Sequence, residues 1–285
     1  MIVVTGATGI VGRVLTDDLL AAGASVRALT RDPESAGLPA AVETVEAAFG
    51  GGQSLEPLLD GADALWLNPA AVPGGTATEL VRAAAAAGVK RVVLLSAAPI
   101  TDTAADEENP ILRWHAAIER AIRDSGLDWT FVRSTAFAAN TLMWAEQIRH
   151  SDTVSWPYAN AVGALVHEKD IAAVATAVLL DQDGTHRSAA YVITGSEALS
   201  RTEQLATIGR AIGRSLHYQE VPPEVALEQM TSTGLPREHA QGALKVVAAT
   251  VGCQPDITPD VERVTGRPAL TFTQWVADHV ADFAA

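Results

Sequence analysis

The chain opens with a short, β-branched apolar run that leads directly into a glycine-rich turn. Residues 1–5 read MIVVT, residues 6–12 read GATGIVG, and a helix-forming stretch follows from Arg13 to Ala22. A buried strand, a glycine turn and a helix start, in this order, form a site for a dinucleotide diphosphate, because free main-chain amides and the helix dipole attract negative charge. The opening residues therefore predict a Rossmann-like α/β fold that binds a dinucleotide.

Each glycine of the turn has its own steric role. Gly6 allows the chain to reverse sharply as it leaves the strand. Gly9 removes a Cβ where a phosphate approaches the backbone, and Gly12 lets the first helix pack closely against the first strand. The spacing is GxxGxxG rather than GxGxxG.

Strand-like and helix-like segments alternate along the chain, which indicates a parallel sheet covered by helices on both faces. We expect a doubly wound, dinucleotide-binding Rossmann domain at residues 1–150 and a smaller α/β substrate lobe at 151–285, interleaved with it. The expected first-half strands are Met1–Thr5, Ser25–Thr30, Val42–Val45, Ala64–Asn68, Arg91–Ser96 and Trp129–Arg133, and the helices are Arg13–Ala22, Leu55–Leu59, Thr76–Ala87, Glu108–Ser125 and Phe137–Arg149. In the second half, Gly163–Val166, Ala189–Thr194 and Leu216–Val221 are expected to be extended, and His167–Leu180, Arg201–Ile212, Pro223–Thr233, Arg237–Thr250 and Thr271–Phe283 to be helical.

Composition narrows the classes of partner. The formal net charge of −14 leaves no basic patch for nucleic acid or an anionic membrane, so neither is expected to bind. The single cysteine, Cys253, fits a reducing cytoplasm. No apolar run of about 18 residues is present, and we expect a cytoplasmic protein. No metal site is expected either, because metal-ligand spacing is absent around His150, His186, His217, His239 and His279.

Several longer motifs carry a family resemblance. VTGATGIVGR, ALTRDPE, IERAIRDSGLDWTFVRSTAFAAN, VHEKDIAAVATAVL and TGRPALTFTQWVADHVADF occur in this order along nearly the full length. Together they resemble the NmrA-like atypical short-chain dehydrogenase/reductases. That family includes NADPH-dependent quinone reductases and other small-molecule reductases, as well as non-catalytic redox-sensing regulators.

The resemblance implies positions for the cofactor. The phosphate loop is matched by Gly6, Thr8, Gly9, Ile10, Val11 and Gly12. Arg31 matches the residue that holds the 2′-phosphate of NADP, and Asn68 with Pro69 matches the loop near the adenosine. Ser96 falls close to the nicotinamide, and His115 falls where many relatives have the lysine that binds the nicotinamide ribose. The segment that passes the carboxamide is matched by Ser134, Thr135, Ala136 and Phe137.

The chain also departs from that pattern. The Tyr-xxx-Lys pair of short-chain dehydrogenases would fall at Ile111 and His115, and neither residue is retained. Carbonyl reduction by the tyrosine mechanism is therefore in doubt.

The end of the second strand indicates the type of dinucleotide. NAD sites place a carboxylate there for the ribose 2′-hydroxyl, whereas this strand ends in Thr30-Arg31. A guanidinium pairs well with a 2′-phosphate. We expect NADP(H) as the preferred cofactor. NAD(H) stays open, because a solvated surface arginine is the alternative and Asp32 is adjacent.

Two residues are candidates for the catalytic chemistry. His115 and Glu119 are four residues apart on one helix face, so the carboxylate would support an imidazolium. The imidazole would then bind the nicotinamide ribose or donate a proton near neutral pH. Ser96 would hydrogen-bond a substrate carbonyl. The alternatives are a helical histidine without a role and a serine that only ends its strand.

Aromatic residues after the sixth strand suggest the substrate. Trp144, Trp156 and Tyr158 would form flat apolar walls for a planar ligand, although core packing is the alternative for tryptophan. We therefore expect an NAD(P)H-dependent oxidoreductase that reduces an apolar, quinone-like or polycyclic small molecule, and the exposed helices are compatible with a homodimer. The alternatives are a non-catalytic NADP-binding redox sensor and a cofactor-binding enzyme that catalyses a non-redox isomerisation or coupling.

Overall fold

The computed structural model describes residues 1–49, 52, 54–72, 75–98, 100–101, 103 and 108–284. A seven-stranded sheet of order β3-β2-β1-β4-β5-β6-β9 lies at its centre, and every pairing in it is parallel. The strands form because apolar runs such as IVVT and ALWL are buried on both faces. This confirms the predicted α/β class. The strands are β1 (Ile2–Thr5), β2 (Val26–Thr30), β3 (Glu43–Glu46), β4 (Ala64–Leu67), β5 (Arg91–Ala97), β6 (Asp128–Ser134) and β9 (Ala189–Ile193).

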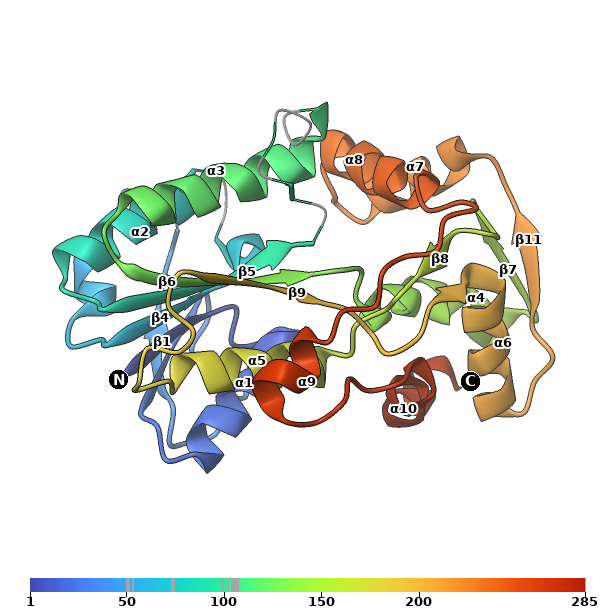
Figure 1. The fold of residues 1–285 in the computed structure, drawn as a ribbon. Coiled ribbons are helices and arrows are strands. Elements are labelled where there is room, and N and C mark those ends of the chain that lie inside the picture. Colours follow the sequence, from blue (N-terminus) through green and yellow to red (C-terminus); the bar gives the residue numbers. More distant parts are fainter. Residues whose placement is uncertain are drawn as a thin grey trace.

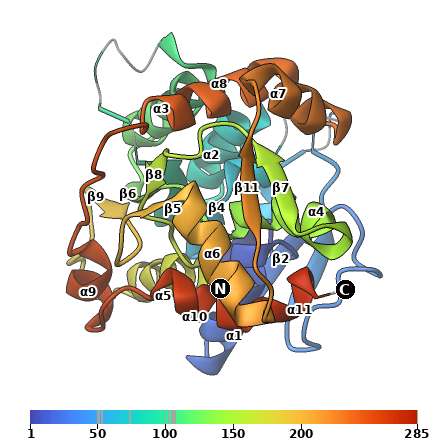
Figure 2. The same ribbon diagram turned by 90° about the vertical axis from the view of Figure 1, so that its right-hand side faces the viewer.

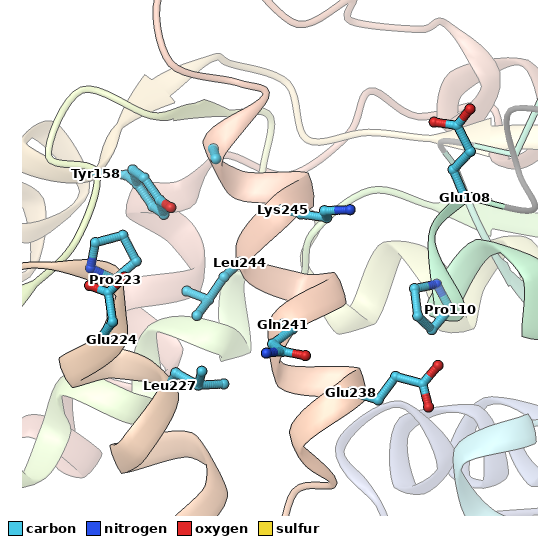
Figure 3. Close-up of a pocket in the computed structure, with 11 residues that line it drawn as sticks. Glu108, Pro110, Tyr158, Pro223, Glu224, Leu227, Glu238, Gln241, Leu244 and Lys245 are labelled. Carbon is cyan, nitrogen blue, oxygen red and sulfur yellow. The ribbon is translucent and has the colours of Figure 1, made fainter.

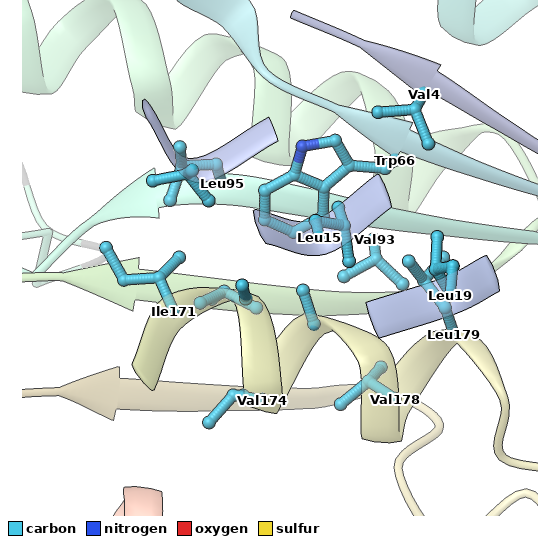
Figure 4. Close-up of a cluster of buried hydrophobic side chains, with 14 of the residues drawn as sticks. Val4, Leu15, Leu19, Trp66, Val93, Leu95, Ile171, Val174, Val178 and Leu179 are labelled. Carbon is cyan, nitrogen blue, oxygen red and sulfur yellow. The ribbon is translucent and has the colours of Figure 1, made fainter. Parts of the chain in front are cut away.

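Helices cover both faces of the sheet (Figure 1). On one face, α1 (Ile10–Ala21) packs against α5 (Glu168–Leu179), and α9 (Asp260–Thr265) packs beside α5. Figure 4 shows Leu15 and Val174 among the apolar side chains that fill this layer. The opposite face carries the short turn η1 (Glu56–Leu59) and the helices α2 (Thr76–Ala86) and α3 (Pro110–Asp124).

The remaining elements form a lobe beyond the C-terminal edge of the sheet. Its strands β7 (Thr153–Trp156) and β11 (His217–Glu220) pair in parallel and lie side by side in Figure 2. A third apolar cluster forms its core. The lobe elements are η4 (Ala138–Trp144), α4 (Ala145–His150), β7 (Thr153–Trp156), β8 (Val162–Gly163), β10 (Leu199–Ser200), α6 (Arg201–Ile212), β11 (His217–Glu220), α7 (Pro223–Ser232), α8 (Arg237–Ala248), α10 (Phe272–Asp278) and α11 (Val280–Phe283).

The chain crosses between sheet and lobe more than once. Both α5 and β9 follow residue 150, yet they complete the central sheet layer by packing on α1 and pairing with β6. The single helix expected over Phe137–Arg149 is instead the 3₁₀ turn η4 followed by α4. No helix within the described ranges is long and apolar enough to cross a membrane.

A buried charge cluster attaches the C-terminal helices to the start of α5. Glu168 accepts hydrogen bonds from Trp275 Nε1 at 2.9 Å and pairs with His279 Nε2 at 2.7 Å. His279 Nδ1 lies 2.9 Å from Asp282, and the imidazole stacks on Trp275. Burial alone would raise the pKa of Glu168, but hydrogen bonds from His167 and His279 lower it to about 2. Burial alone would lower the pKa of His279, but its hydrogen bonds with Glu168 and Asp282 outweigh this effect and raise that pKa.

His279→Asn is expected to destabilise the protein more at low pH than at high pH. A raised folded-state pKa means that the ion-pair contribution is complete below the ordinary value of 6.5 and is lost as the pH rises through the folded value. We expect Tm to fall by a few degrees near pH 6 and by less near pH 9. His217→Asn, at an exposed position on β11, is the matched control. An equal loss of Tm at both pH values would contradict this role of His279.

Candidate functional site

The glycine turn has the shape of an anion cradle. Gly6 adopts φ 69°, and a Cβ there would lie 2.8 Å from Asn68 Nδ2. A Cβ on Gly12 would lie only 2.0 Å from the Gly6 carbonyl oxygen. Gly9 is the N-cap of α1 and offers no capping side chain, and the first turn of the helix contains no acidic residue. The amides of this helix start are therefore free to bind a diphosphate.

Two charged residues follow β2, and their side chains differ in whether they are already bonded. Asp32 accepts hydrogen bonds from the amides of Glu34 at 3.1 Å and Ser35 at 3.2 Å. Hydrogen bonds from Ser35 and Glu34 lower the pKa of Asp32. Arg31 is exposed, and no hydrogen bond or ion pair engages its side chain within the described residues. Asp32 thus stabilises its own turn, while Arg31 is available to an anion.

A cavity of about 270 Å³ extends from the glycine turn along the C-terminal edge of the sheet. Its walls come from the start of α1, the short turn η2 (Pro69–Ala71), the ends of β4, β5 and β6, and the first turns of α3. Seven of the residues predicted for the cofactor line it: Val11, Asn68, Pro69, Ser96, His115, Ser134 and Phe137.

The segment after β6 is held by the lobe. Thr135 Oγ1 donates to the Ala164 carbonyl at 2.8 Å, and Val166 exchanges hydrogen bonds with Ala136 and Ala138 at 2.9 and 2.8 Å. The side chain of Thr135 therefore serves the backbone. Phe137 projects from this fixed segment into the cavity wall.

The structure changes the interpretation of His115. Its partner was expected to be Glu119, but Glu119 instead binds Ser96 and two arginines. His115 Nδ1 is buried and has no hydrogen-bond partner among the described residues. Burial lowers the pKa of His115 to about 4. The imidazole is consequently neutral near neutral pH, and the expected imidazolium acid is wrong.

The sequence analysis missed the role of Glu119 as the centre of a buried network. Its side chain is fully buried, and it accepts a hydrogen bond from Ser96 Oγ at 2.6 Å. Arg133 binds it through Nε at 3.0 Å and through a terminal nitrogen at 2.6 Å. Arg133 lies within the apolar run WTFVRS of β6. A charge inside such a run is the signal that could have indicated a buried ion pair.

The three aromatic residues predicted to form a ligand wall lie in two different places, the core of the lobe and a second cavity. Trp144 and Trp156 are 0% and 4% exposed and belong to the lobe core, so they do not form the ligand wall expected of them. They are buried because they pack with other large apolar side chains of the lobe, among them Phe272, Trp275 and Phe283, in one core. Tyr158, at φ 61°, lines a larger cavity of about 520 Å³.

That larger cavity lies between α7, α8 and the start of α3. Figure 3 shows Leu227 on α7 and Leu244 on α8 facing one another, with Tyr158 above them and Glu238 at the far side. Trp114 of α3 lines the smaller cavity and stacks on His239 of α8, with 6.1 Å between the ring centroids. This contact joins the walls of the two cavities. Within the described parts of the chain, no cluster of three or more potential metal ligands occurs.

Comparison with known proteins places these features in context. The sequence model of the NmrA-like family matches residues 1–267. The chain is 38% identical to a (4-alkanoyl-5-oxo-2,5-dihydrofuran-3-yl)methyl phosphate reductase of Streptomyces griseus, covering 100% of this chain and 99% of the relative. It is 32% identical to an NAD(P)H azoreductase of Xenophilus azovorans over 100% of both chains.

A solved structure shows the same fold. The crystal structure of an NADPH-dependent quinone oxidoreductase from Escherichia coli superposes with a TM-score of 0.79 at 23% identity, covering 98% of this chain and 99% of that chain.

Proposed function

The chain belongs to the NmrA-like family, and we propose that it is an NADP(H)-dependent reductase of conjugated, electron-poor small molecules. The observation that carries this proposal is the cavity of about 270 Å³ that begins at the free helix start of the glycine turn. A diphosphate at the turn would place the rest of a dinucleotide along this cavity.

The residues present fit this cofactor. The turn keeps its tight conformation because Gly6 and Gly12 lack side chains, since a Cβ on either would lie 2.8 Å or less from another atom of the protein. Arg31 would hold the 2′-phosphate. His115 Nδ1, a buried atom without a partner, would gain one from a ligand hydroxyl. A bound dihydronicotinamide supplies a hydride, and the chain's own residues bind it, orient it and exclude water.

Among the described residues that line the smaller cavity, none supplies an acid for a substrate. Ser96 donates its hydroxyl proton to Glu119, and Ser134 donates its own to the Thr135 carbonyl at 2.9 Å. His115 is neutral, because burial lowers its pKa to about 4. Ile111 stands where the family resemblance would place a catalytic tyrosine. We infer that the reduction does not use the Tyr-xxx-Lys mechanism.

A cavity without a proton donor favours hydride acceptors that do not need a proton as they are reduced. A simple ketone needs a proton as the hydride arrives, because its alkoxide is strongly basic. A quinone, an azo group or a conjugated lactone spreads the charge, so water can protonate the product anion afterwards. The relatives support this inference, because their names give a dihydrofuranone, an azo compound and a quinone as their substrates. The larger cavity, with Tyr158 and Leu244 in its wall, would hold the apolar part of the substrate.

NADPH oxidation with a panel of acceptors tests the proposal. We expect turnover with quinones, azo compounds and acyl butenolides, and none with unconjugated ketones of similar size. We also expect kcat to change little between roughly pH 6 and pH 9, because the described lining of the smaller cavity supplies no acid for the reaction. A tenfold fall of kcat per pH unit would reveal an acid that the account lacks. NADP(H) binding without turnover on any acceptor would favour a redox sensor.

A further inference from the structure

Tyr158 has a backbone conformation that a bulky residue rarely adopts. Its φ of 61° lies in the left-handed region, which glycine and asparagine occupy at much lower cost. The turn around it is nevertheless fixed, because the Tyr158 carbonyl accepts from the Ala161 amide at 2.9 Å and the Pro157 carbonyl accepts from the Tyr218 hydroxyl at 2.9 Å. Backbone strain that the surrounding structure holds in place is common at ligand sites. The side chain of Tyr158 is therefore a candidate for a role of its own.

The Tyr158 hydroxyl differs from those of the other two tyrosines of the chain. Tyr218 donates to the Pro157 carbonyl, and the Tyr191 hydroxyl lies 2.7 Å from His186 Nδ1. Within the described residues no hydrogen bond engages the hydroxyl of Tyr158, which lines the larger cavity. Figure 3 shows this hydroxyl turned toward Leu244. It is thus available to a molecule in the cavity.

The helices beside Tyr158 give the cavity an apolar wall. Leu227 and Pro223 come from α7, and Leu244 comes from α8. Leu227 and Leu244 face one another across the cavity in Figure 3. A wall of this kind fits an alkyl or aryl group, with the Tyr158 hydroxyl as a polar contact beside it.

The charged groups around the cavity narrow the class of ligand. Its described lining contains three carboxylates and one ammonium group, namely Glu108, Glu224, Glu238 and Lys245. Arg113 pairs with Glu238 at 3.2 Å, and the other two carboxylates still outnumber Lys245. This excess of negative charge disfavours an anionic ligand. A phenol donates a hydrogen bond more strongly than it accepts one, because its lone pair is delocalised into the ring, so an uncharged oxygen acceptor suits Tyr158 best.

We propose that the larger cavity recognises an uncharged oxygen acceptor, such as a ketone, on the side chain of the substrate, and that Tyr158 determines this specificity. The apolar wall holds the side chain while the Tyr158 hydroxyl donates to its oxygen. This inference rests on the proposed reductase function and deepens it. The stack of Trp114 on His239 joins this cavity to the smaller one, so the recognised oxygen lies away from the atom that receives the hydride.

Matched pairs of naphthoquinones test the proposal. In each pair one quinone carries a side chain that ends in a methyl ketone, and its partner carries a chain of equal length that ends in an isopropyl group of similar shape. A series of chain lengths covers the distance to Tyr158. The measured preference is kcat/KM for the ketone divided by kcat/KM for the isopropyl compound.

Tyr158→Phe is expected to lower the preference by about threefold to tenfold at the chain length that reaches the hydroxyl, the value of one hydrogen bond. The kcat/KM of the isopropyl partner should hardly change, because the ring is retained. Tyr191→Phe is the matched control, since it removes a hydroxyl that binds His186 outside the cavity lining, and its preference should equal that of the wild type. Equal preferences in the wild type and Tyr158→Phe at every chain length would overturn the proposal.

Tyr158→Gly removes the whole side chain from the same turn. Glycine adopts a φ of 61° freely, so we expect the variant to fold, which circular dichroism verifies. It should lose the ketone preference and also show a lower kcat/KM for the isopropyl partner, because the aromatic part of the wall is missing. Retention of the ketone preference in Tyr158→Gly would contradict the role of the hydroxyl. A wild-type preference for a carboxylate-ended chain over the ketone would contradict the uncharged class.

The two proposals can fail separately. If the wild type reduces none of the quinones, the proposed function fails, and titration calorimetry with the ketone and isopropyl compounds still compares Tyr158→Phe with the wild type. If the quinones are reduced and Tyr158→Phe retains the full preference, only the assignment of Tyr158 fails.

Discussion

Gly12→Ala is expected to weaken NADPH binding by about 100-fold or more, because it separates the first helix from the phosphate turn. The new Cβ would lie 2.0 Å from the Gly6 carbonyl oxygen and 2.8 Å from the Ala7 Cα. Both neighbours are backbone atoms, so no flexible side chain can move aside. The start of α1 must shift, and the free amides of the turn then no longer converge on one anion.

Titration calorimetry with NADPH measures this effect, and circular dichroism verifies that the variant is folded. Gly75→Ala is the matched control: Gly75 also precedes a helix, it has φ −76°, and a Cβ there would meet no atom of the described residues within 4 Å. Its affinity should equal that of the wild type. A folded Gly12→Ala variant with wild-type affinity would show that the turn does not hold the diphosphate.

Arg31→Ala is expected to lower the affinity for NADPH by about 10- to 100-fold, the value of charge-assisted hydrogen bonds to a phosphate. The affinity for NADH should hardly change, because NADH lacks the 2′-phosphate. Arg31 follows β2, which pairs with β1 and therefore ends beside the glycine turn. Asp32 is held by its own turn, so we expect it not to compete for the ribose.

The ratio of the two dissociation constants is the decisive quantity for Arg31, since it cancels any general loss of stability. Arg82→Ala, at an exposed position of α2, controls for the loss of one positive charge from an acidic protein. If Arg31→Ala weakens the binding of NADPH and of NADH equally, the arginine does not bind the 2′-phosphate.

Much of the sheet could be predicted from the sequence because its strands are apolar runs and its links are short. The expected Ala64–Asn68 and Arg91–Ser96 correspond to β4 and β5 within one residue at each end. The sequence did not predict the short strand β7. Its partner β11 lies far along the chain, and no local pattern indicates their pairing. The helix α9 was missed as well, although Asp260 and Glu262 favour its first turn.

The site was predictable where main-chain geometry dominates and less so where side chains compete. The glycine turn follows from local sterics at Gly6 and Gly12. The partner of Glu119 does not, because helix spacing favoured His115, whereas Arg133 of β6 binds Glu119 at 2.6 Å. The pKa of His115 depends on burial by residues from several elements, which helix periodicity cannot reveal.

A single-turnover experiment measures whether NADPH bound at the glycine turn transfers its hydride to an acceptor. The protein is loaded with one equivalent of NADPH and mixed rapidly with a quinone while the absorbance of the reduced nicotinamide is followed. The account predicts that the absorbance disappears in one phase and that Gly12→Ala abolishes this phase. Persistence of the absorbance with quinones, azo compounds and acyl butenolides alike would contradict a reductase built on the glycine turn.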